Sequence, residues 1–212
     1  MYKLENDELL TEEIKNAFKR NVVRNKAIFK GENRGNIKLP DEYQEVEYLE
    51  STGTQWIDTG VKLSDYYRNL IFSAEFQATN LNVNSIVGGC RLTEAKEYFF
   101  PVLINSTNFQ SNSGKGDNLE ITIGNSDTKR HKFISNSFNG ECSLDDNKYK
   151  YINSEANCNI NIYLFAFNSD NTSARRTGNV RLYSIKMQTN NNILIRDFIP
   201  CYRKSDNKPR II

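Results

Sequence analysis

The sequence has one tryptophan, one histidine and four cysteines among its 212 residues. With a single histidine, any Ser-His-Asp or Cys-His catalytic arrangement would have to use His131. No nucleophile elbow is present to accompany it. The cysteines form no C-x-x-C pair and no zinc-type spacing, so we expect no zinc site. Four reduced structural thiols are expected instead: Cys90, Cys142, Cys158 and Cys201.

Long apolar runs and an excess of one charge are also missing. No stretch approaches the roughly 20 apolar residues that a membrane helix requires. Residues 1–10 are acidic and lack the apolar segment of a secretory signal. The net charge of +2 gives no field that favours nucleic acid or an anionic membrane. We therefore expect no nucleic-acid partner, no membrane insertion, and solvated faces for the basic runs at residues 129–132 and 175–176.

Short segments of alternating apolar and polar residues, separated by turn residues, occupy most of the chain from Leu39-Pro40 onward. This pattern is typical of a β-sandwich or barrel, and the lack of a fixed-period repeat excludes a propeller or solenoid. Residues 111–117 and 168–173 are predicted turns. The predicted strands are residues 44–49, 55–59, 69–78, 84–89, 98–104, 107–110, 118–123, 131–137, 149–152, 159–167, 178–187 and 193–199.

The first residues differ from the rest of the chain. Thr11 is followed by two acids, as at a helix N-terminus, and apolar residues then recur at four-residue spacing. These apolar residues are Leu10, Ile14, Phe18 and Val22. The spacing predicts a helix over residues 7–25 and a linker over residues 32–36. We expect two parts: an anchoring or oligomerisation segment at residues 1–36 and a β-sandwich at residues 37–212.

Several ordered blocks carry a family resemblance. The first is residues 46–60, VEYLESTGTQWIDTG, followed by residues 86–89, 162–168, 178–186 and 196–201. Over residues 39–208 the chain resembles the concanavalin A-like, laminin-G-type jelly-roll modules of phage virion proteins and gut-bacterial surface proteins. The resemblance implies an all-β fold, a two-sheet antiparallel jelly-roll sandwich, with the aromatic at Trp56 packed inside. It supplies no catalytic residues and no cofactor.

The end of the chain departs from this family. Relatives usually continue past the Pro200-Cys201 strand into a further turn and strand, whereas this sequence stops at Ile212. We expect either a missing last strand or an edge that continues in a partner, since an unpaired sheet edge is a natural site for another chain.

Residues 45–50, EVEYLE, resemble the E-x-D-x-x-E strand of jelly-roll glucanases. A retaining glycosidase needs two carboxyl groups about 5–5.5 Å apart, which here would be Glu45 and Glu50. Three features count against catalysis: Glu47 stands at the middle position, the motif lies in the first strand, and one Trp cannot line a series of sugar subsites. Acids exposed on an edge strand are the favoured interpretation, and we expect no enzyme activity.

The other candidate sites have ordinary structural explanations. His131 is expected to be an exposed strand residue whose neighbours Arg130 and Lys132 oppose its protonation. Residues 145–147 and 169–171 offer oxygen ligands for calcium but lack the EF-hand order and are ordinary turns. Several side chains could contact carbohydrate, although the sequence does not choose among them. They are Tyr66, Tyr67, Tyr98, Phe99, Tyr149, Tyr151 and Arg176.

These observations lead to one functional hypothesis with two alternatives. We expect a non-enzymatic phage virion structural protein, a tail, baseplate or head-fibre component, that displays a lectin-like module toward a host-surface glycan or another virion protein. The N-terminal segment would contact other virion proteins, and the protein would be a homo-oligomer, a trimer as is common for such fibres. The alternatives are a bacterial surface adhesin or carbohydrate-binding module, and a retaining endo-glycosidase using Glu45 and Glu50.

Overall fold

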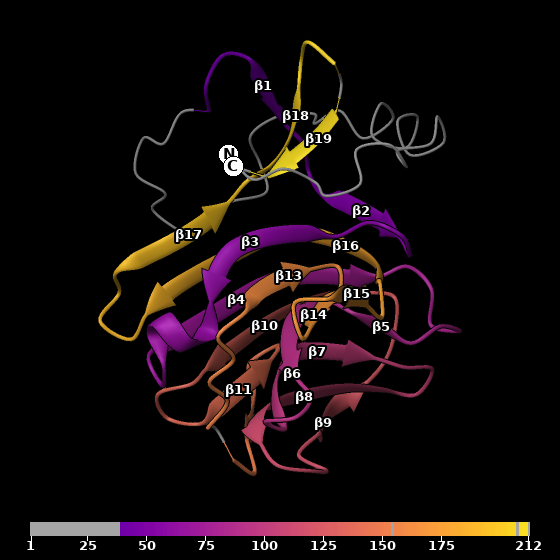
Figure 1. Cartoon of the computed structure of the whole chain (residues 1–212). Coiled ribbons are helices and arrows are strands. Elements are labelled where there is room, and N and C mark those ends of the chain that lie inside the picture. Colours follow the sequence, from indigo (N-terminus) through magenta and orange to yellow (C-terminus); the bar gives the residue numbers. More distant parts are fainter. Residues whose placement is uncertain (1–38, 154, 207, 212) are drawn as a thin grey trace.

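The computed structural model describes residues 39–153, 155–206 and 208–211 (Figure 1). The predicted helix at residues 7–25 and the linker at residues 32–36 lie outside these residues, so the division at residue 36 stays a prediction. The described residues form β-strands and one short 3-10 helix, η2 (Leu63–Tyr66). Within this range no helix is both long and apolar enough to cross a membrane.

A seven-stranded antiparallel sheet forms one layer of the fold. Its spatial order is β12 (Asn147–Lys150), β11 (Glu141–Leu144), β10 (Arg130–Asn136), β4 (Leu70–Ala78), β16 (Asn179–Thr189) and β17 (Leu194–Phe198). The seventh strand, β2 (Leu49–Thr52), pairs with the first residues of β16. β4 therefore lies in the middle of this layer and pairs with β10 on one side and β16 on the other.

A nine-stranded sheet forms the second layer. Its main order is β15 (Ser173–Arg175), β14 (Phe167–Ser169), β6 (Gly88–Leu92), β7 (Glu97–Ile104), β8 (Asn108–Lys115) and β9 (Ile121–Asn125). β13 (Asn161–Leu164) pairs with β6 and with β3 (Ile57–Lys62), and β5 (Ser85–Ile86) pairs with β7. The β14–β6 pair is parallel, and the other pairs of this sheet are antiparallel.

A small third sheet brings together residues from both ends of the described range. β18 (Pro200–Arg203) lies between β1 (Tyr43–Glu45) and β19 (Lys208–Ile211), and both pairings are antiparallel. The strand that contains Pro200 and Cys201 is thus paired on both sides, and a further strand follows it.

The core lies between the two large sheets because alternate residues of their strands point inward. In β4 these residues are Leu70, Phe72, Ala74, Phe76 and Ala78, and all of them are buried. The ring of Phe72 meets Phe99 of β7 at 5.8 Å, and the ring of Phe76 meets Phe109 of β8 at 5.6 Å, both edge to face. This packing of two antiparallel layers confirms the predicted all-β sandwich.

The structure differs most from the sequence prediction in strands that contain many polar residues. Residues 111–117 were predicted as a turn, but β8 runs through Lys115 and buries Ser111, Asn112 and Ser113. The Ser111 hydroxyl lies 3.0 Å from the Tyr151 hydroxyl inside the sandwich, which explains how a polar residue is accommodated there. The strand β11 was not predicted at all.

Three predicted strands are each divided in two. The predicted strand 44–49 separates into β1 and β2, which belong to different sheets. The predicted strand 84–89 separates into β5 and β6 at Val87. Within β6, the φ of +152° at Gly89 and its close approach to the carbonyl oxygen of Phe99 leave no room for a side chain. The predicted strand 159–167 breaks at Phe165, which has a φ of +64° between β13 and β14.

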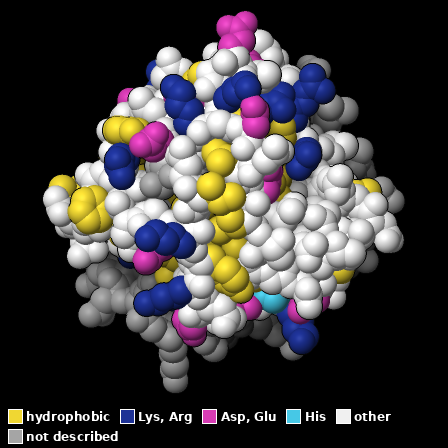
Figure 2. All heavy atoms as spheres, turned by 90° about the horizontal axis from the view of Figure 1, so that it is seen from below, with side chains coloured by type: hydrophobic (Ala, Val, Ile, Leu, Met, Phe, Trp, Pro, Cys, Tyr) yellow, Lys and Arg dark blue, Asp and Glu magenta, His cyan; other side chains and the backbone are white. Residues whose placement is uncertain are grey.

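One side of the sandwich is formed by the strands at the edges of the two sheets. β9 and β12 are edge strands, and Gly124 of β9 approaches Leu144 of β11. Figure 2 views the molecule from this side and shows an apolar stripe that ends next to His131, the only histidine. Ile121 of β9 and Tyr149 of β12 are partly buried apolar residues packed against the core.

Two phenylalanines close in sequence provide a matched test of this core. Phe133 is fully buried, whereas Phe138 is exposed in the turn after β10. We expect Phe133→Ala to lower the free energy of unfolding by about 3–5 kcal/mol because it leaves a cavity. Phe138→Ala should change it by no more than about 0.5 kcal/mol. Urea unfolding of both variants measures the difference, and equal effects would contradict the sandwich core described above.

Candidate functional site

The two acids proposed for glycosidase chemistry lie in different sheets. Glu45 is exposed on β1 and stands opposite Cys201 of β18. Glu50 lies on β2 in the seven-stranded sheet, where its Oε2 accepts a hydrogen bond from Nε of Arg181 at 2.8 Å. Glu45 and Glu50 therefore do not lie on one continuous strand that could present both carboxyl groups to the same site.

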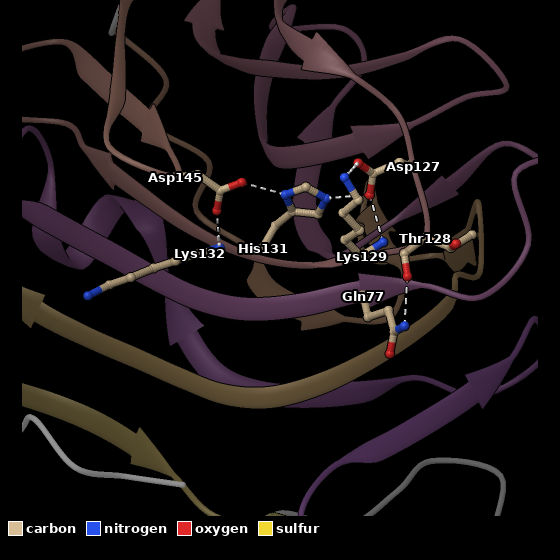
Figure 3. Close-up of polar contacts among 7 residues, drawn as sticks. All are labelled: Gln77, Asp127, Thr128, Lys129, His131, Lys132 and Asp145. Atoms are coloured by element: carbon tan, nitrogen blue, oxygen red, sulfur yellow. Dashed lines mark hydrogen bonds and ion pairs between the residues drawn. The ribbon is translucent and has the colours of Figure 1, made fainter.

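The prediction of an exposed His131 is wrong. His131 is buried, and its ring nitrogens contact two carboxylates (Figure 3): Nδ1 lies 2.6 Å from Asp145 and Nε2 lies 2.8 Å from Asp127. Because side chains alternate along β10, the neighbours Arg130 and Lys132 point to the opposite face of the sheet. The positive charges adjacent in sequence are therefore not the groups that surround the ring.

The imidazole ring joins three segments of the chain. It packs against the rings of Phe76 and Phe109, with centroids 5.7 and 4.9 Å away. Asp145 comes from the β11–β12 turn and also accepts a hydrogen bond from the backbone N–H of Lys132 at 2.8 Å. Since carboxylates occupy both ring nitrogens, the geometry suits a structural clamp better than a general base.

The contacts of Asp127 with His131 and Lys129 change the pKa of its carboxyl group. Partial burial opposes its ionisation, but hydrogen bonds from the backbone N–H of Lys129, at 2.6 Å, and from His131 favour the charged form. The net result is that the pKa of Asp127 is lowered from its ordinary value of 3.8.

The two candidate calcium loops are occupied by internal hydrogen bonds. Asp145 and Asp146 have φ values of +47° and +70° in the turn between β11 and β12, and Asp145 binds His131. Asp170 accepts hydrogen bonds from the backbone N–H and the hydroxyl of Thr93 at 2.7 and 2.6 Å. Among the described residues, no group of three or more His, Cys, Asp or Glu side chains is arranged to hold a metal ion.

The cysteines and Trp56 occupy packing positions. All four cysteines are buried and none forms a disulfide, and burial raises the pKa of Cys142 to about 11. Trp56 was predicted to pack inside the fold, but it is only half-buried and stacks on Tyr163 of β13 with ring centroids 4.1 Å apart. The strand β3 begins one residue later, at Ile57, so the indole lies at the edge of the core.

The candidate carbohydrate contacts do not form one surface. Phe99 and Tyr151 are buried in the sandwich, whereas Tyr67 and Arg176 are exposed. Tyr66, Tyr98 and Tyr149 are partly buried against apolar clusters.

A cluster that the sequence analysis missed lies on the outer face of the seven-stranded sheet. Its members face away from the core and contact one another through ring, ion-pair and hydrogen-bond contacts, and we call them the arginine–tyrosine array. They are Tyr48, Glu50, Glu75, Gln77, Arg130, Arg181 and Tyr183.

Strand register aligns the polar members of this array. Arg130 of β10 stands opposite Gln77 of β4, Gln77 stands opposite Arg181 of β16, and Arg181 stands opposite Glu50 of β2. Four neighbouring strands thus place four polar side chains in one line across the sheet. Gln77 also donates a hydrogen bond to the backbone carbonyl of Thr128 at 2.7 Å (Figure 3), which connects the array to the loop that carries Asp127.

The tyrosine rings fill the spaces between the guanidinium groups. The guanidinium carbon of Arg130 lies 3.9 Å from the ring centroid of Tyr183, and that of Arg181 lies 4.6 Å from the ring of Tyr48. The two rings meet edge to face at 5.4 Å. Glu75 forms an ion pair with Arg130, in addition to the pair between Arg181 and Glu50.

A β-bulge places Tyr183 in this array. The pairing of β16 with β4 shifts between Leu182 and Ser184, so Tyr183 is an extra residue on the outer face. Burial raises the pKa of Tyr183, and the neutral hydroxyl donates a hydrogen bond to Oε1 of Gln77 at 2.7 Å. No local motif marks the array in the sequence, since its members come from four strands and from Tyr48, which precedes β2.

The lowered pKa of Asp127 predicts a dependence of stability on pH. A carboxyl group with a depressed folded pKa stabilises the fold above its unfolded pKa, and this stabilisation is lost as pH falls through the folded value. We expect wild-type stability to decline below about pH 4 and Asp127→Asn to have a shallower decline. Thermal unfolding at a series of pH values measures this, with Asp146→Asn as the control. If the stability of Asp127→Asn and of wild type declined equally with falling pH, Asp127 would not be the source of this pH dependence.

No family model matches the chain, and no curated protein matches it. Among solved structures it is similar to the mouse laminin alpha1 chain, domains LG4-5, with a TM-score of 0.46 and 19% identity. The similarity covers 69% of this chain and 42% of that chain, so the chain spans less than half the length of that structure. The paired antiparallel layers have the two-sheet, jelly-roll architecture predicted from the sequence.

Proposed function

We propose that the chain is a non-enzymatic phage virion structural protein, a tail, baseplate or head-fibre component, that displays its sandwich as a lectin-like binding module. The observation that carries the binding part of this proposal is the arginine–tyrosine array. The virion part is supported by the resemblance of residues 46–60 and 196–201 to modules of phage virion proteins.

The array suits a glycan ligand because its polar groups are held in place before binding. The side chains of Arg130 and Arg181 are 31% and 32% exposed, and each is fixed by one carboxylate and one tyrosine ring. Guanidinium, carboxylate and amide groups at fixed positions offer both donors and acceptors to sugar hydroxyl groups. Preorganisation lowers the entropy cost of binding.

A binding role is favoured over catalysis by the positions of the candidate catalytic groups. Glu45 and Glu50 come from different sheets, and the Glu50 carboxylate is bound by Arg181. The ring nitrogens of His131 both contact carboxylates. None of these side chains is arranged with a partner as a glycosidase or a triad hydrolase would require.

Substitution of the two arginines tests the binding surface. We expect Arg130→Ala and Arg181→Ala each to weaken binding to polysaccharide extracted from the host cell wall at least tenfold, because a charge-assisted contact of about 1.5–3 kcal/mol is lost. Isothermal titration calorimetry measures the affinity, and Lys148→Ala, on the exposed β12, serves as the charge-matched control. Arg181→Lys separates loss of charge from loss of the planar donor group. Only variants that unfold like wild type are compared. If all of them bind the polysaccharide with unchanged affinity, the array is not the binding surface.

Removal of residues 1–36 tests the virion assignment. We expect the full chain to be found in purified virus particles by mass spectrometry and the shortened chain to be absent from them, since this segment is the proposed anchor. The Lys148→Ala variant should be incorporated like wild type. Detection of the chain only on the bacterial surface would favour the alternative, an adhesin or carbohydrate-binding module. Equal incorporation of the shortened chain would reject the anchor.

A further inference from the structure

Exposed apolar side chains are concentrated at one end of the seven-stranded sheet. Among the residues whose burial the structure describes, six large apolar side chains are exposed, and five of them lie at this end. We call these five the apolar row. Its members, with their exposed fractions, are Tyr67 (46%), Phe138 (59%), Ile152 (65%), Ile193 (64%) and Leu194 (47%). The sixth, Val83, lies between β4 and β5.

Strand order places the apolar row along a line. Ile152 follows β12, Phe138 lies in the β10–β11 turn, Tyr67 precedes β4, and Ile193 and Leu194 lie at the β16–β17 turn, at the left of Figure 1. Backbone hydrogen bonds join these segments side by side: Tyr151 to Gly140, Ser137 to Leu70, Asn190 to Asn69, and Thr189 to Ile193. Six strands at about 4.8 Å spacing give the row a length of roughly 24 Å.

The chemistry of the apolar row favours a protein occupant. Ile152, Ile193 and Leu194 are aliphatic and cannot stack on sugar rings as aromatic side chains do. Charged residues of both signs lie beside the row, so it has no single-sign field for an anionic membrane or nucleic acid. These charged residues are Asp65, Arg68, Lys150 and Glu155, all of them exposed. Apolar contact framed by sparse charges of mixed sign is the composition of a protein–protein interface.

The exposed area matches what a stable dimer needs. Taking about 200 Å² for each fully exposed large apolar residue, as for an aromatic residue, the exposed fractions of the five residues add up to roughly 500–600 Å². A standard interface buries about 800 Å² on each partner, of which about 57–65% is apolar, or about 450–520 Å². The exposed area of the apolar row is therefore comparable in size with the apolar part of one side of such an interface.

We propose that the apolar row is the interface between two copies of this chain, related by a two-fold axis near Tyr67. The row has apolar side chains at both ends and one near its centre, so an antiparallel copy is complementary to it. Ile152 of one copy would pack on Ile193 and Leu194 of the other, and Phe138 would pack beside Tyr67 of the other copy. This inference does not depend on the virion role or on glycan binding.

The two-fold axis also sets the contacts at the centre of the interface. Tyr67 precedes β4, the fourth of the six strands in spatial order, so the two Tyr67 rings would lie about one strand spacing, or ~5 Å, apart, as aromatic pairs prefer. Arg68 and Asp65 lie next to Tyr67 and carry opposite charges. The axis brings Arg68 of one copy toward Asp65 of the other, which gives complementary charges on both sides of the centre.

The oligomeric state of the full chain tests this interface. We expect sedimentation equilibrium to show an association that Phe138→Ser combined with Ile193→Ser weakens at least tenfold, which lowers the weight-average mass at about 10 µM protein. Val83→Ser, the exposed apolar residue outside the row, should leave the mass unchanged. The proposal would be overturned by the following result: the mass of the wild-type chain does not change with concentration up to about 100 µM, and it equals the mass of the double variant.

Cross-linking tests the position of the axis. The native cysteines are buried, so Tyr67→Cys introduces one accessible thiol near the same thiol of the second copy. We expect oxidised glutathione to convert Tyr67→Cys to a disulfide-linked dimer, while Val83→Cys stays uncross-linked. Equal cross-linking of the two variants would overturn the proposal. Loss of polysaccharide binding in the Phe138→Ser and Ile193→Ser variant without a change in mass would do so too, because the row would then be a ligand surface.

Discussion

The packing of β4 between two sheets is the interaction on which the rest of the structure depends. Its inward residues Phe72 and Phe76 meet Phe99 and Phe109 of the opposite sheet, and these contacts join the layers. Its outward residue Gln77 lies between two arginines on neighbouring strands, and the residue before its start is joined to the β16–β17 turn. One strand therefore aligns the core, the arginine–tyrosine array and the apolar row.

The sequence predicts the parts of this fold in which polarity alternates. β4, β10 and β16 were located within one or two residues because every second side chain enters an apolar core. The sequence predicts a turn at Ser111 and its neighbours, whereas their burial in a strand depends on Tyr151, 40 residues away. The wrong prediction of an exposed His131 and the lack of any prediction for the arginine–tyrosine array have the same cause. Their partners are set by strand pairing between distant segments, which local patterns do not specify.

The array and the apolar row belong to the same sheet but occupy different surfaces. Arg130, Gln77 and Arg181 lie on its outer face, whereas Tyr67 and Ile193 lie at the ends of its strands. Association through strand ends would leave the outer faces of both copies open. Two arrays held in one assembly would engage a repeating polysaccharide together, and the second contact would then form at a high effective concentration.

The small sheet of β1, β18 and β19 has a mechanical consequence. Tyr43, where the chain enters β1, is paired with Arg203, while Ile211, the last residue of β19, is paired with Pro200 at the opposite end of β18. A force that pulls the two outer strands apart along their length would act in shear. It would load the hydrogen bonds of the whole sheet together instead of opening them one by one. The load would pass through these short strands, and the sandwich core would carry little of the tension.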